Sequence, residues 1–307
     1  MIVVTGGSGF LGQSLAALLS DAVFLSSKDL DLTDRTRVLE FIGEVKPTTV
    51  VHLAARVGGI NTNIAYPADF LVENATMDAN LIGALSAFPP EHFIPVLSTC
   101  MYPDALPDSA YPMEEGQIEE GPPPPTNAAY AASKRLLMHG TMALSQQYSV
   151  GFTGLVPANL FGPGDHFGEE RSHFLAAAMH RIEGARVEGL ASVPFMGTGR
   201  AFRQYVYVRD VAHVVSRLID LGPRNRMLNL APVENRTIRE LAELTADACG
   251  YGGAIDFTGE GPDGQLRKDV SIAALTDELP EWFDLETEFS VALAETLDWY
   301  RNNVATG

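Results

Sequence analysis

The sequence has little of three things that would place the protein in a specialised class. It has only two cysteines, Cys100 and Cys249, and no CxxC motif, which argues against a disulfide framework and favours a reduced, cytoplasmic compartment. No apolar run approaches the ~20 residues of a membrane span, and the first residues, "MIVVTGG", indicate a strand rather than a signal peptide. Basic residues are also scarce, with 21 Lys and Arg against 39 Asp and Glu. We therefore expect no nucleic-acid-binding face, although local arginines could still bind a phosphate.

Apolar strands and helical patterns alternate through the first half of the chain. Strands are predicted at "IVVTG", "AVFLSS", "TVVHLAA", "FIPVLST" and "GFTGLVP", with helices at 10–19, 35–44, 68–87 and 127–147 between them. Strands separated by helices predict a parallel sheet, and nearly all-apolar strands predict helices on both faces. The sequence therefore predicts an α/β fold with a Rossmann-type, doubly wound parallel sheet.

The regular alternation of strands and helices ends near Pro157. Beyond it we expect helices at 172–183, 210–221, 237–249 and 285–301, and short strands at 193–195, 204–208 and 227–230. These elements predict two domains. The first comprises residues 1–157 with part of the 200–235 region, and the remainder of 158–307 forms a smaller, mixed α/β substrate-binding lobe.

A glycine-rich loop follows the first strand. The spacing Gly6-x-x-Gly9-x-x-Gly12 opens the first helix, a context in which glycines let the backbone approach a pyrophosphate at the helix N-terminus. The second strand ends in Ser26-Ser27-Lys28, where binders of NAD usually carry an acid, so we expect NADP. Asp31 is placed to reach the adenine edge.

A tyrosine and a lysine lie four residues apart in "YAASK". On a helix, Tyr130 and Lys134 share one face. We expect the Lys134 ammonium to lower the pKa of Tyr130, so that the phenol can pass a proton to a carbonyl oxygen as hydride arrives at its carbon. Ser98, at the end of the fourth strand, is the expected third member.

Together these motifs resemble the extended short-chain dehydrogenase/reductase superfamily, and within it the GDP-L-fucose synthases. The resemblance is carried by "VHLAARVGGINTNIAYPADFLVEN", "STCMYP", "PTNAAYAASK", "PANLFGPGDHF", "SHF" and "PDGQLRK". It implies a two-lobed fold, NADPH, a homodimer packed through two long helices, and a GDP-sugar substrate. The implied reaction converts GDP-4-keto-6-deoxy-D-mannose to GDP-L-fucose by 3,5-epimerisation and 4-reduction.

The resemblance also assigns roles to individual residues. It implies a reductase triad of Ser98, Tyr130 and Lys134, and an epimerisation pair of Cys100 and His173. The implied cofactor-binding residues are Gly6, Gly7, Ser8, Gly9, Phe10, Leu11, Gly12, Lys28, Asp31, Leu32, Leu53, Ala54, Ala55, Lys134, Pro157, Asn159, Leu160 and His173. The implied substrate contacts are Arg181, Met196, Arg203, Asp263 and Lys268.

Several positions depart from the family pattern. Met196 replaces a tryptophan, "RQY" at 203–205 replaces "REF", Ala128 replaces a glutamate, and the usual arginine after the second strand is missing. These departures bear on sugar preference and on NADP selectivity more than on the class of reaction.

Epimerisation beside a ketone requires a base on one face of the sugar and an acid on the other. The pKa of a thiol is close enough to neutral for Cys100 to be tuned into a base, and His173 could close over the opposite face. The alternative for Cys100 is a small buried apolar residue, which is also our interpretation of Cys249. The histidines at 166, 173 and 180 recur every seven residues, but the first lies in a loop pattern, so no metal site is predicted.

Other functions remain open at this point. A 4-epimerase with tightly held NAD would need Tyr130 and Lys134 but neither Cys100 nor His173. A single-function reductase or epimerase of a related GDP-keto sugar is also compatible. A non-catalytic NADP-binding sensor would need none of these side chains.

Overall fold

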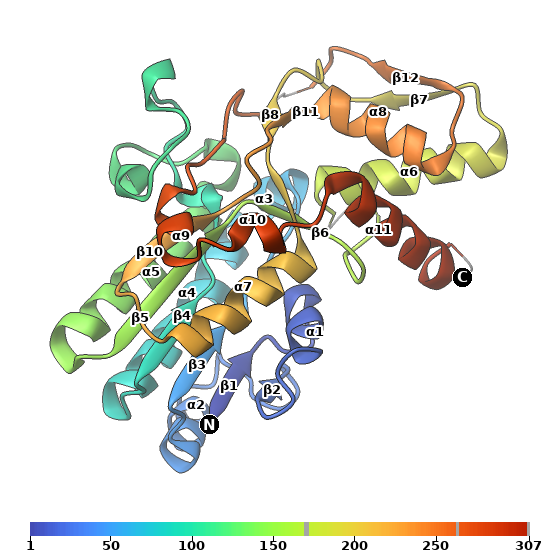
Figure 1. Ribbon diagram of the computed structural model, residues 1–307. Helices are drawn as coiled ribbons and strands as arrows, with labels where there is room; N and C mark the ends of the chain where they lie inside the picture. Colours follow the sequence, from blue (N-terminus) through green and yellow to red (C-terminus); the bar gives the residue numbers. More distant parts are fainter. Residues whose placement is uncertain (169–171, 262–263, 306–307) are drawn as a thin grey trace.

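A six-stranded parallel sheet forms the centre of the larger part of the molecule (Figure 1). The computed structural model describes residues 1–168, 172–261 and 264–305. The strand order is β10-β5-β4-β3-β1-β2, and all neighbours run parallel. The strands are β1 (Ile2–Thr5), β2 (Val23–Leu25), β3 (Thr49–His52), β4 (His92–Pro95), β5 (Gly151–Pro157) and β10 (Arg226–Leu230).

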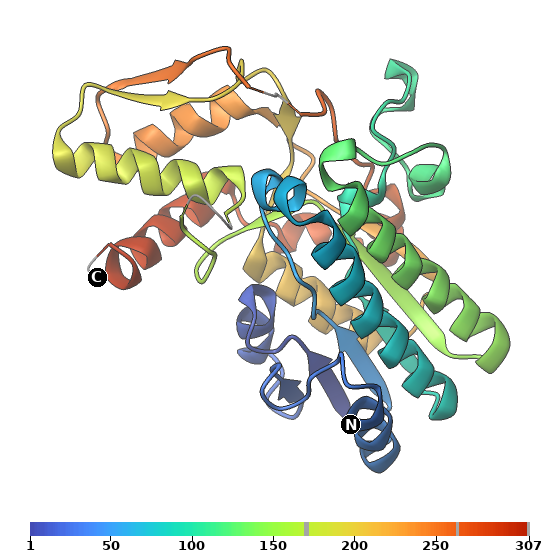
Figure 2. The same cartoon turned by 180° about the vertical axis from the view of Figure 1, so that it is seen from behind.

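Helices cover both faces of this sheet. On one face, α1 (Phe10–Ala16) contacts α7 (Val208–Leu221). On the other, α2 (Arg35–Val45), α4 (Pro67–Ala87) and α5 (Ala128–Tyr148) form a layer, seen in Figure 2. A hydrophobic core fills each interface, and all four residues of β4 are buried. The predicted doubly wound sheet is therefore confirmed.

The chain reverses its direction of travel across the sheet beside β1. The next strand in sequence, β2, pairs on one side of β1, whereas β3 pairs on the other. In open α/β sheets, ligands bind in the crevice at the carboxyl ends of strands at such a switch point. The glycine loop after Thr5 lies at this crevice.

A smaller lobe lies beyond the carboxyl ends of the strands (Figure 1). Its core joins α6 (Phe174–Glu188), α8 (Ile238–Cys249) and α11 (Phe289–Asn303) to a parallel pair of strands. Those strands are β7 (Ser192–Phe195) and β12 (Ala254–Phe257). A capping box starts α8, because the Thr237 hydroxyl accepts from the Glu240 N–H and the Glu240 carboxylate accepts from the Thr237 N–H.

Short elements complete the fold. A parallel pair joins β6 (Asn159–Phe161) to β9 (Tyr205–Tyr207), and an antiparallel pair joins β8 (Phe202–Arg203) to β11 (Arg236–Thr237). The remaining helices are α3 (Ile60–Ala65), α9 (Ala273–Glu278) and α10 (Trp282–Leu285), with single 3₁₀ turns at Thr99–Met101, Asp108–Ala110, Glu115–Glu119 and Pro125–Asn127.

Each predicted strand and helix is present, with shifted ends. For example, α1 ends at Ala16 rather than at residue 19, and α11 begins at Phe289 rather than at residue 285. Seven short elements were not predicted, because elements of this length carry no measurable periodicity. They are α3, α9, α10, β6, β8, β11 and β12. None of the helices in the described residues is both long enough and apolar enough to cross a membrane.

Candidate active site

The glycine loop has the geometry of a phosphate cradle. Gly6 adopts a φ of +72°, and its position would place a Cβ 2.6 Å from the backbone nitrogen of Ala54. A Cβ at Gly12 would lie 2.5 Å from the carbonyl oxygens of Gly6 and Gly7. Since no side chain caps the start of α1 at Gly9, its first N–H groups are left for a ligand. These residues fit the pyrophosphate of a dinucleotide.

The other predicted cofactor residues line the same edge of the sheet. Leu53 donates its N–H to the Thr5 carbonyl at 3.1 Å, which brings the end of β3 beside the glycine loop. Asn159, just after β5, donates through its side-chain nitrogen to the Gln204 carbonyl at 3.3 Å. The structure thus gathers at this edge three predicted segments, namely Gly6–Gly12, 53–55 and 157–160.

An acid does lie near the end of β2, contrary to our interpretation of the sequence. The Asp29 carboxylate folds back on the turn and accepts hydrogen bonds from the N–H and hydroxyl of Ser26, at 2.8 and 2.6 Å. Hydrogen bonds from Ser26, with a smaller effect of the Lys28 ammonium, lower the pKa of Asp29. Asp31 is likewise held in a local turn, accepting from the N–H and hydroxyl of Thr33.

The Tyr130–Lys134 pair lies beside Val96 and Ser98, on the segment that leaves β4. The Lys134 ammonium donates to the Val96 carbonyl at 3.0 Å and is 5.9 Å from the centre of the Tyr130 ring. Burial raises the pKa of Tyr130, the negative charges of Cys100 and Asp78 add to that rise, and the hydrogen bond with Ser98 opposes it. Our expectation that Lys134 lowers the pKa of Tyr130 is therefore wrong for this structure, because burial dominates. A protonated phenol is nevertheless the form that can donate a proton.

Cys100 is the middle residue of the 3₁₀ turn Thr99–Met101 that follows β4, and it faces a cation. The Ser98 hydroxyl accepts from the Cys100 N–H at 3.1 Å, and the Lys268 ammonium lies 3.3 Å from the Cys100 sulfur. Burial raises the pKa of the thiol, but Lys268, with hydrogen bonds from Ser98 and Asn127, outweighs it, and the net pKa is lowered. This environment favours a thiolate, and the sequence analysis did not foresee the contribution of Asn127.

His173 stands at the start of α6 and completes the cluster. Desolvation of the imidazole, and then the Lys268 ammonium, lower its pKa from 6.5 to about 4. The imidazole is therefore neutral near pH 7. Lys268 lies close enough to influence both Cys100 and His173, so the structure brings the predicted epimerisation pair to one place.

The predicted substrate contacts lie in and beside the smaller lobe. Arg181, on α6, lies over the Phe195 ring at 5.8 Å and contacts the Pro194 carbonyl. Arg203 donates to the carbonyl of Gln265 at 2.7 Å. Met196 is 64% exposed just after β7. Asp263 lies outside the described residues, and no contact links Arg181 or Met196 to Cys100 among the described ones.

One departure from the family pattern has a structural reason. Gln204 stands where the family has a glutamate, and it is almost fully buried. Its side-chain nitrogen donates to the Pro232 carbonyl at 2.7 Å, while its oxygen accepts from the Val270 N–H at 2.9 Å. An amide can both donate and accept, whereas a carboxylate can only accept.

A buried chain of polar side chains, not predicted from the sequence, lies near the Tyr130–Lys134 pair. The Thr5 hydroxyl lies 2.6 Å from His52 Nδ1, and His52 Nε2 lies 2.9 Å from Asp78 Oδ1. Asp78 is 1% exposed, and its Oδ2 has no hydrogen-bond partner in the described part of the chain. Burial lowers the pKa of Lys134, and the Asp78 carboxylate acts against that change. Asp78 lies on the inner face of α4, four residues after the buried Asn74. An acid at that position is the sequence signal that could have indicated the buried polar chain.

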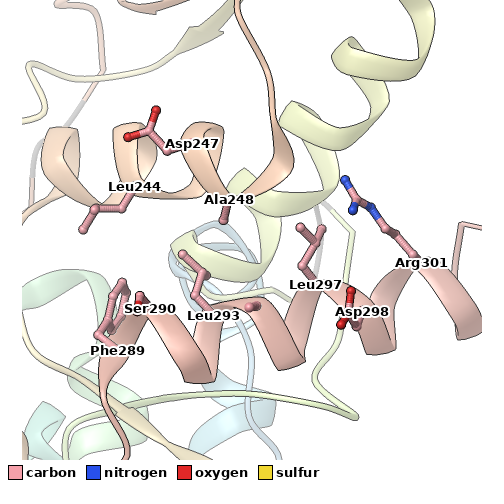
Figure 3. A pocket seen from close by; sticks show the side chains of 10 residues that line it. Leu244, Asp247, Ala248, Phe289, Ser290, Leu293, Leu297, Asp298 and Arg301 are labelled. Carbon is pink, nitrogen blue, oxygen red and sulfur yellow. The ribbon is translucent and has the colours of Figure 1, made fainter.

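Two hollows lie away from this cluster. One, of about 300 Å³, lies between α8 and α11 (Figure 3) and is lined mainly by apolar side chains, together with Asp247, Asp298 and Arg301. The other, of about 420 Å³, lies between α2 and the end of α4. Neither is lined by a predicted site residue. In residues 1–168, 172–261 and 264–305, no group of His, Cys, Asp or Glu is arranged to hold a metal.

Known proteins match this chain in both sequence and fold. Residues 2–231 match the NAD dependent epimerase/dehydratase family, and the chain belongs to that family. A GDP-L-fucose synthase of Dictyostelium discoideum is 30% identical, covering 99% of this chain and 96% of the relative. GDP-L-fucose synthase 1 of Arabidopsis thaliana is 32% identical, covering 99% and 94%.

A solved structure agrees with these relatives. A GDP-L-fucose synthetase from Naegleria fowleri bound to NADP is 31% identical and superposes with a TM-score of 0.87, covering 100% of this chain and 94% of the other. Within the epimerase/dehydratase family, the chain thus stands among the GDP-L-fucose synthases.

Proposed function

We propose that the protein converts GDP-4-keto-6-deoxy-D-mannose to GDP-L-fucose, by epimerisation at C3 and C5 followed by reduction at C4 with NADPH. The observation that carries the proposal is the position of the Cys100 thiol. It lies beside the Lys268 ammonium, two residues after Ser98, at the same edge of the sheet as Tyr130. A reductase alone needs Tyr130 and Lys134. The adjacent activated thiol supplies the base that epimerisation requires.

The chain provides for the cofactor along the carboxyl edge of the sheet. The Gly6–Gly12 loop holds the pyrophosphate, Lys28 faces the 2′-phosphate, and Lys134 holds a ribose hydroxyl. Bound NADPH supplies the hydride. The Asp29 carboxylate is hydrogen-bonded to Ser26 and is therefore turned toward its own loop. This orientation supports NADP binding despite the missing arginine, because the carboxylate is directed away from the 2′-phosphate.

Reduction uses Tyr130 as the proton donor. Its raised pKa keeps the phenol protonated, so it can transfer a proton to the C4 oxygen as the carbonyl is reduced. Ser98 holds the same oxygen. The Lys134 ammonium favours the phenolate that is left behind.

Epimerisation uses the two sides of the sugar. The Cys100 thiolate removes a proton beside the ketone, the charge moves to the C4 oxygen, and Ser98 and Tyr130 stabilise it there. His173 returns a proton from the other side. Because His173 is neutral in the free protein, it must first gain a proton, and the negative charge of the diphosphate substrate and the enolate favours that gain.

Cationic side chains bind the anionic substrate in this acidic protein. Arg181 and Arg203 bind the diphosphate and sugar, Met196 lies beside the nucleotide, and Lys268 reaches the sugar from above Cys100. The assignment of Asp263 rests on the resemblance alone.

We also propose the domain division near residue 157 and a cytoplasmic, homodimeric enzyme. The separate core of the smaller lobe supports the division, and the two free thiols support the compartment. For the dimer, the outer faces of α4 and α5 expose the apolar side chains Leu71, Val72, Leu136 and Met142. Sedimentation velocity would measure the assembly.

An isotope-exchange experiment tests the function. With NADP⁺ bound to prevent reduction, the 4-keto substrate in D2O should gain deuterium at C3 and C5. Cys100→Ser should lower the exchange rate at least ~100-fold, the scale of a general base, yet still reduce an already epimerised ketone with NADPH. Cys249→Ser, the matched control at the other cysteine, should exchange normally.

Three outcomes distinguish the alternatives. Wild-type exchange in Cys100→Ser would remove the thiol from the mechanism. Reduction without any exchange in the wild type would indicate a single-function reductase. Interconversion at C4 with no net use of NADPH would indicate a 4-epimerase.

A further inference from the structure

Lys268 belongs to a segment that returns from the smaller lobe to the sheet, and its ammonium ends beside the Cys100 sulfur. The 3.3 Å between nitrogen and sulfur is within hydrogen-bonding distance. Lys268 and Cys100 are separated by 168 positions in the sequence. Their contact therefore depends on how the segment is held in space.

Three neighbouring parts of the molecule hold this segment. Gln265 donates to the Pro103 carbonyl at 3.0 Å, just after the turn that contains Cys100. The Leu266 carbonyl accepts from the Phe202 N–H at 2.8 Å. Beyond Lys268, the Met113 N–H donates to the Asp269 carbonyl, and the Met113 carbonyl accepts from the Ser271 N–H. The backbone on each side of Lys268 is thus fixed.

Among the described residues, no acid pairs with the Lys268 ammonium. The carboxylate next in sequence, Asp269, is engaged by the Arg267 guanidinium at 2.6 and 3.0 Å. In the part of the chain that the structure describes, no carboxylate lies within ion-pair distance of Lys268. The sulfur is therefore available as its anionic partner.

We propose that Lys268 is a positioning residue, whose ammonium holds Cys100 as the thiolate that accepts the substrate proton. The inference rests on the proposed function. In the step it supports, a C–H bond of the sugar breaks, the proton passes to the sulfur, and the electron pair moves to the C4 oxygen. Lys268 keeps its proton throughout.

The other groups around the sulfur do not supply this charge. Ser98, in the same turn, and Asn127, before α5, offer neutral hydrogen bonds, and Tyr130, on α5, is protonated because its pKa is raised. His173, at the start of α6, is neutral because its pKa is lowered. Loss of Lys268 should therefore raise the pKa of the Cys100 thiol, so that less of it is thiolate at neutral pH.

The first test measures the thiol without substrate or cofactor. In a Cys249→Ala background, Cys100 is the only cysteine, and its alkylation by iodoacetamide is followed by intact mass across pH. Lys268→Met should move the midpoint of this profile to higher pH and lower the rate at pH 7 at least about tenfold, as for the loss of one charge-assisted hydrogen bond. The rate at high pH should not change.

Two variants control for structure and charge. Lys268→Arg keeps the cation and should keep the midpoint near that of the parent. Lys46→Met removes an exposed ammonium at the end of α2 and should change nothing. A parental midpoint in Lys268→Met, with folding verified by urea unfolding, would overturn the inference.

The second test separates this inference from the proposed function. Deuterium exchange into the 4-keto sugar should be lost in Lys268→Met at pH 7 and recover as the pH is raised, which a role in substrate binding alone would not produce. If the wild type exchanges normally and the alkylation midpoint does not move, the inference fails and the function stands. If the wild type shows no exchange but the midpoint moves, the function fails and the ion pair stands.

Discussion

Glu183 is the buried anion that joins the helices of the smaller lobe, and its removal should weaken that lobe. The carboxylate is only 3% exposed and receives two forked pairs of hydrogen bonds, from Arg186 on the same helix and from Arg301 on α11, all between 2.7 and 2.9 Å. Arg301 also donates to the Cys249 carbonyl at the end of α8. Three helices, including the one that begins after His173, therefore depend on one charge.

The size of the effect follows from the pKa. The hydrogen bonds from Arg186, followed by those from Arg301, lower the pKa of Glu183 from 4.5 to about 2 against the opposing effect of burial. A difference of that size corresponds to roughly 3 kcal/mol of folding free energy. Because the folded pKa is the lower one, this stability is present in full above about pH 4.5 and is lost as the pH falls toward 2. Glu183→Gln should therefore cost about 3 kcal/mol at neutral pH.

The two tryptophans allow the lobes to be followed separately. Trp282 is fully buried in the core beside the sheet, whereas Trp299, on α11, stacks on Phe167 in the smaller lobe. In a Trp282→Phe background, urea unfolding by fluorescence reports the lobe that contains Glu183. The control is Glu188→Gln, an exposed acid on the same helix, which should have little effect. A Glu183→Gln penalty that is absent at pH 7, or that does not shrink on acidification, would refute the reasoning.

Three further outcomes follow from the site. Tyr130→Phe should reduce the ketone at least ~100-fold more slowly while NADPH still binds, and near-normal reduction would show that another group protonates the oxygen. Lys28→Ala should weaken NADPH without changing NADH, measured by kcat/KM, and equal use of both cofactors by the wild type would contradict the NADP assignment. Arg203→Ala should cost about 1.5–3 kcal/mol in substrate binding, and an unchanged KM and kcat would remove Arg203 from the substrate site.

The sheet and its cofactor edge could be predicted because their signals are local. An apolar strand, a glycine spacing and a helix follow one another within a dozen or so residues of the first strand, and each restricts the others. The turn at Asp29 was missed for the opposite reason. Whether its carboxylate points at a ligand or back to Ser26 depends on turn geometry that composition does not encode.

The electrostatics of the site could not be predicted, because they depend on contacts between distant segments. Lys268 meets Cys100 only after the chain has crossed the smaller lobe and returned. The pKa of Tyr130 was expected to follow its neighbour Lys134, but it follows burial instead, since desolvation acts through everything that surrounds the phenol. The four-residue spacing on the helix identified Tyr130 and Lys134 as neighbours but predicted the wrong direction for the pKa shift of Tyr130.

The two halves of the proposed chemistry draw their charges from different parts of the fold. The cation used in reduction, Lys134, and the buried acid behind it, Asp78, both belong to the sheet domain. In epimerisation, Lys268 follows β12 in sequence but lies on a segment held against Pro103 and Met113 of the sheet domain. His173, in contrast, stands at the start of α6 in the smaller lobe. A change in how α6 is held would therefore move the imidazole, while leaving Tyr130, Lys134 and the contact of Lys268 with Cys100 in place. Epimerisation should thus be the activity more sensitive to how the smaller lobe is held, and the link between Glu183 and α6 makes this dependence measurable.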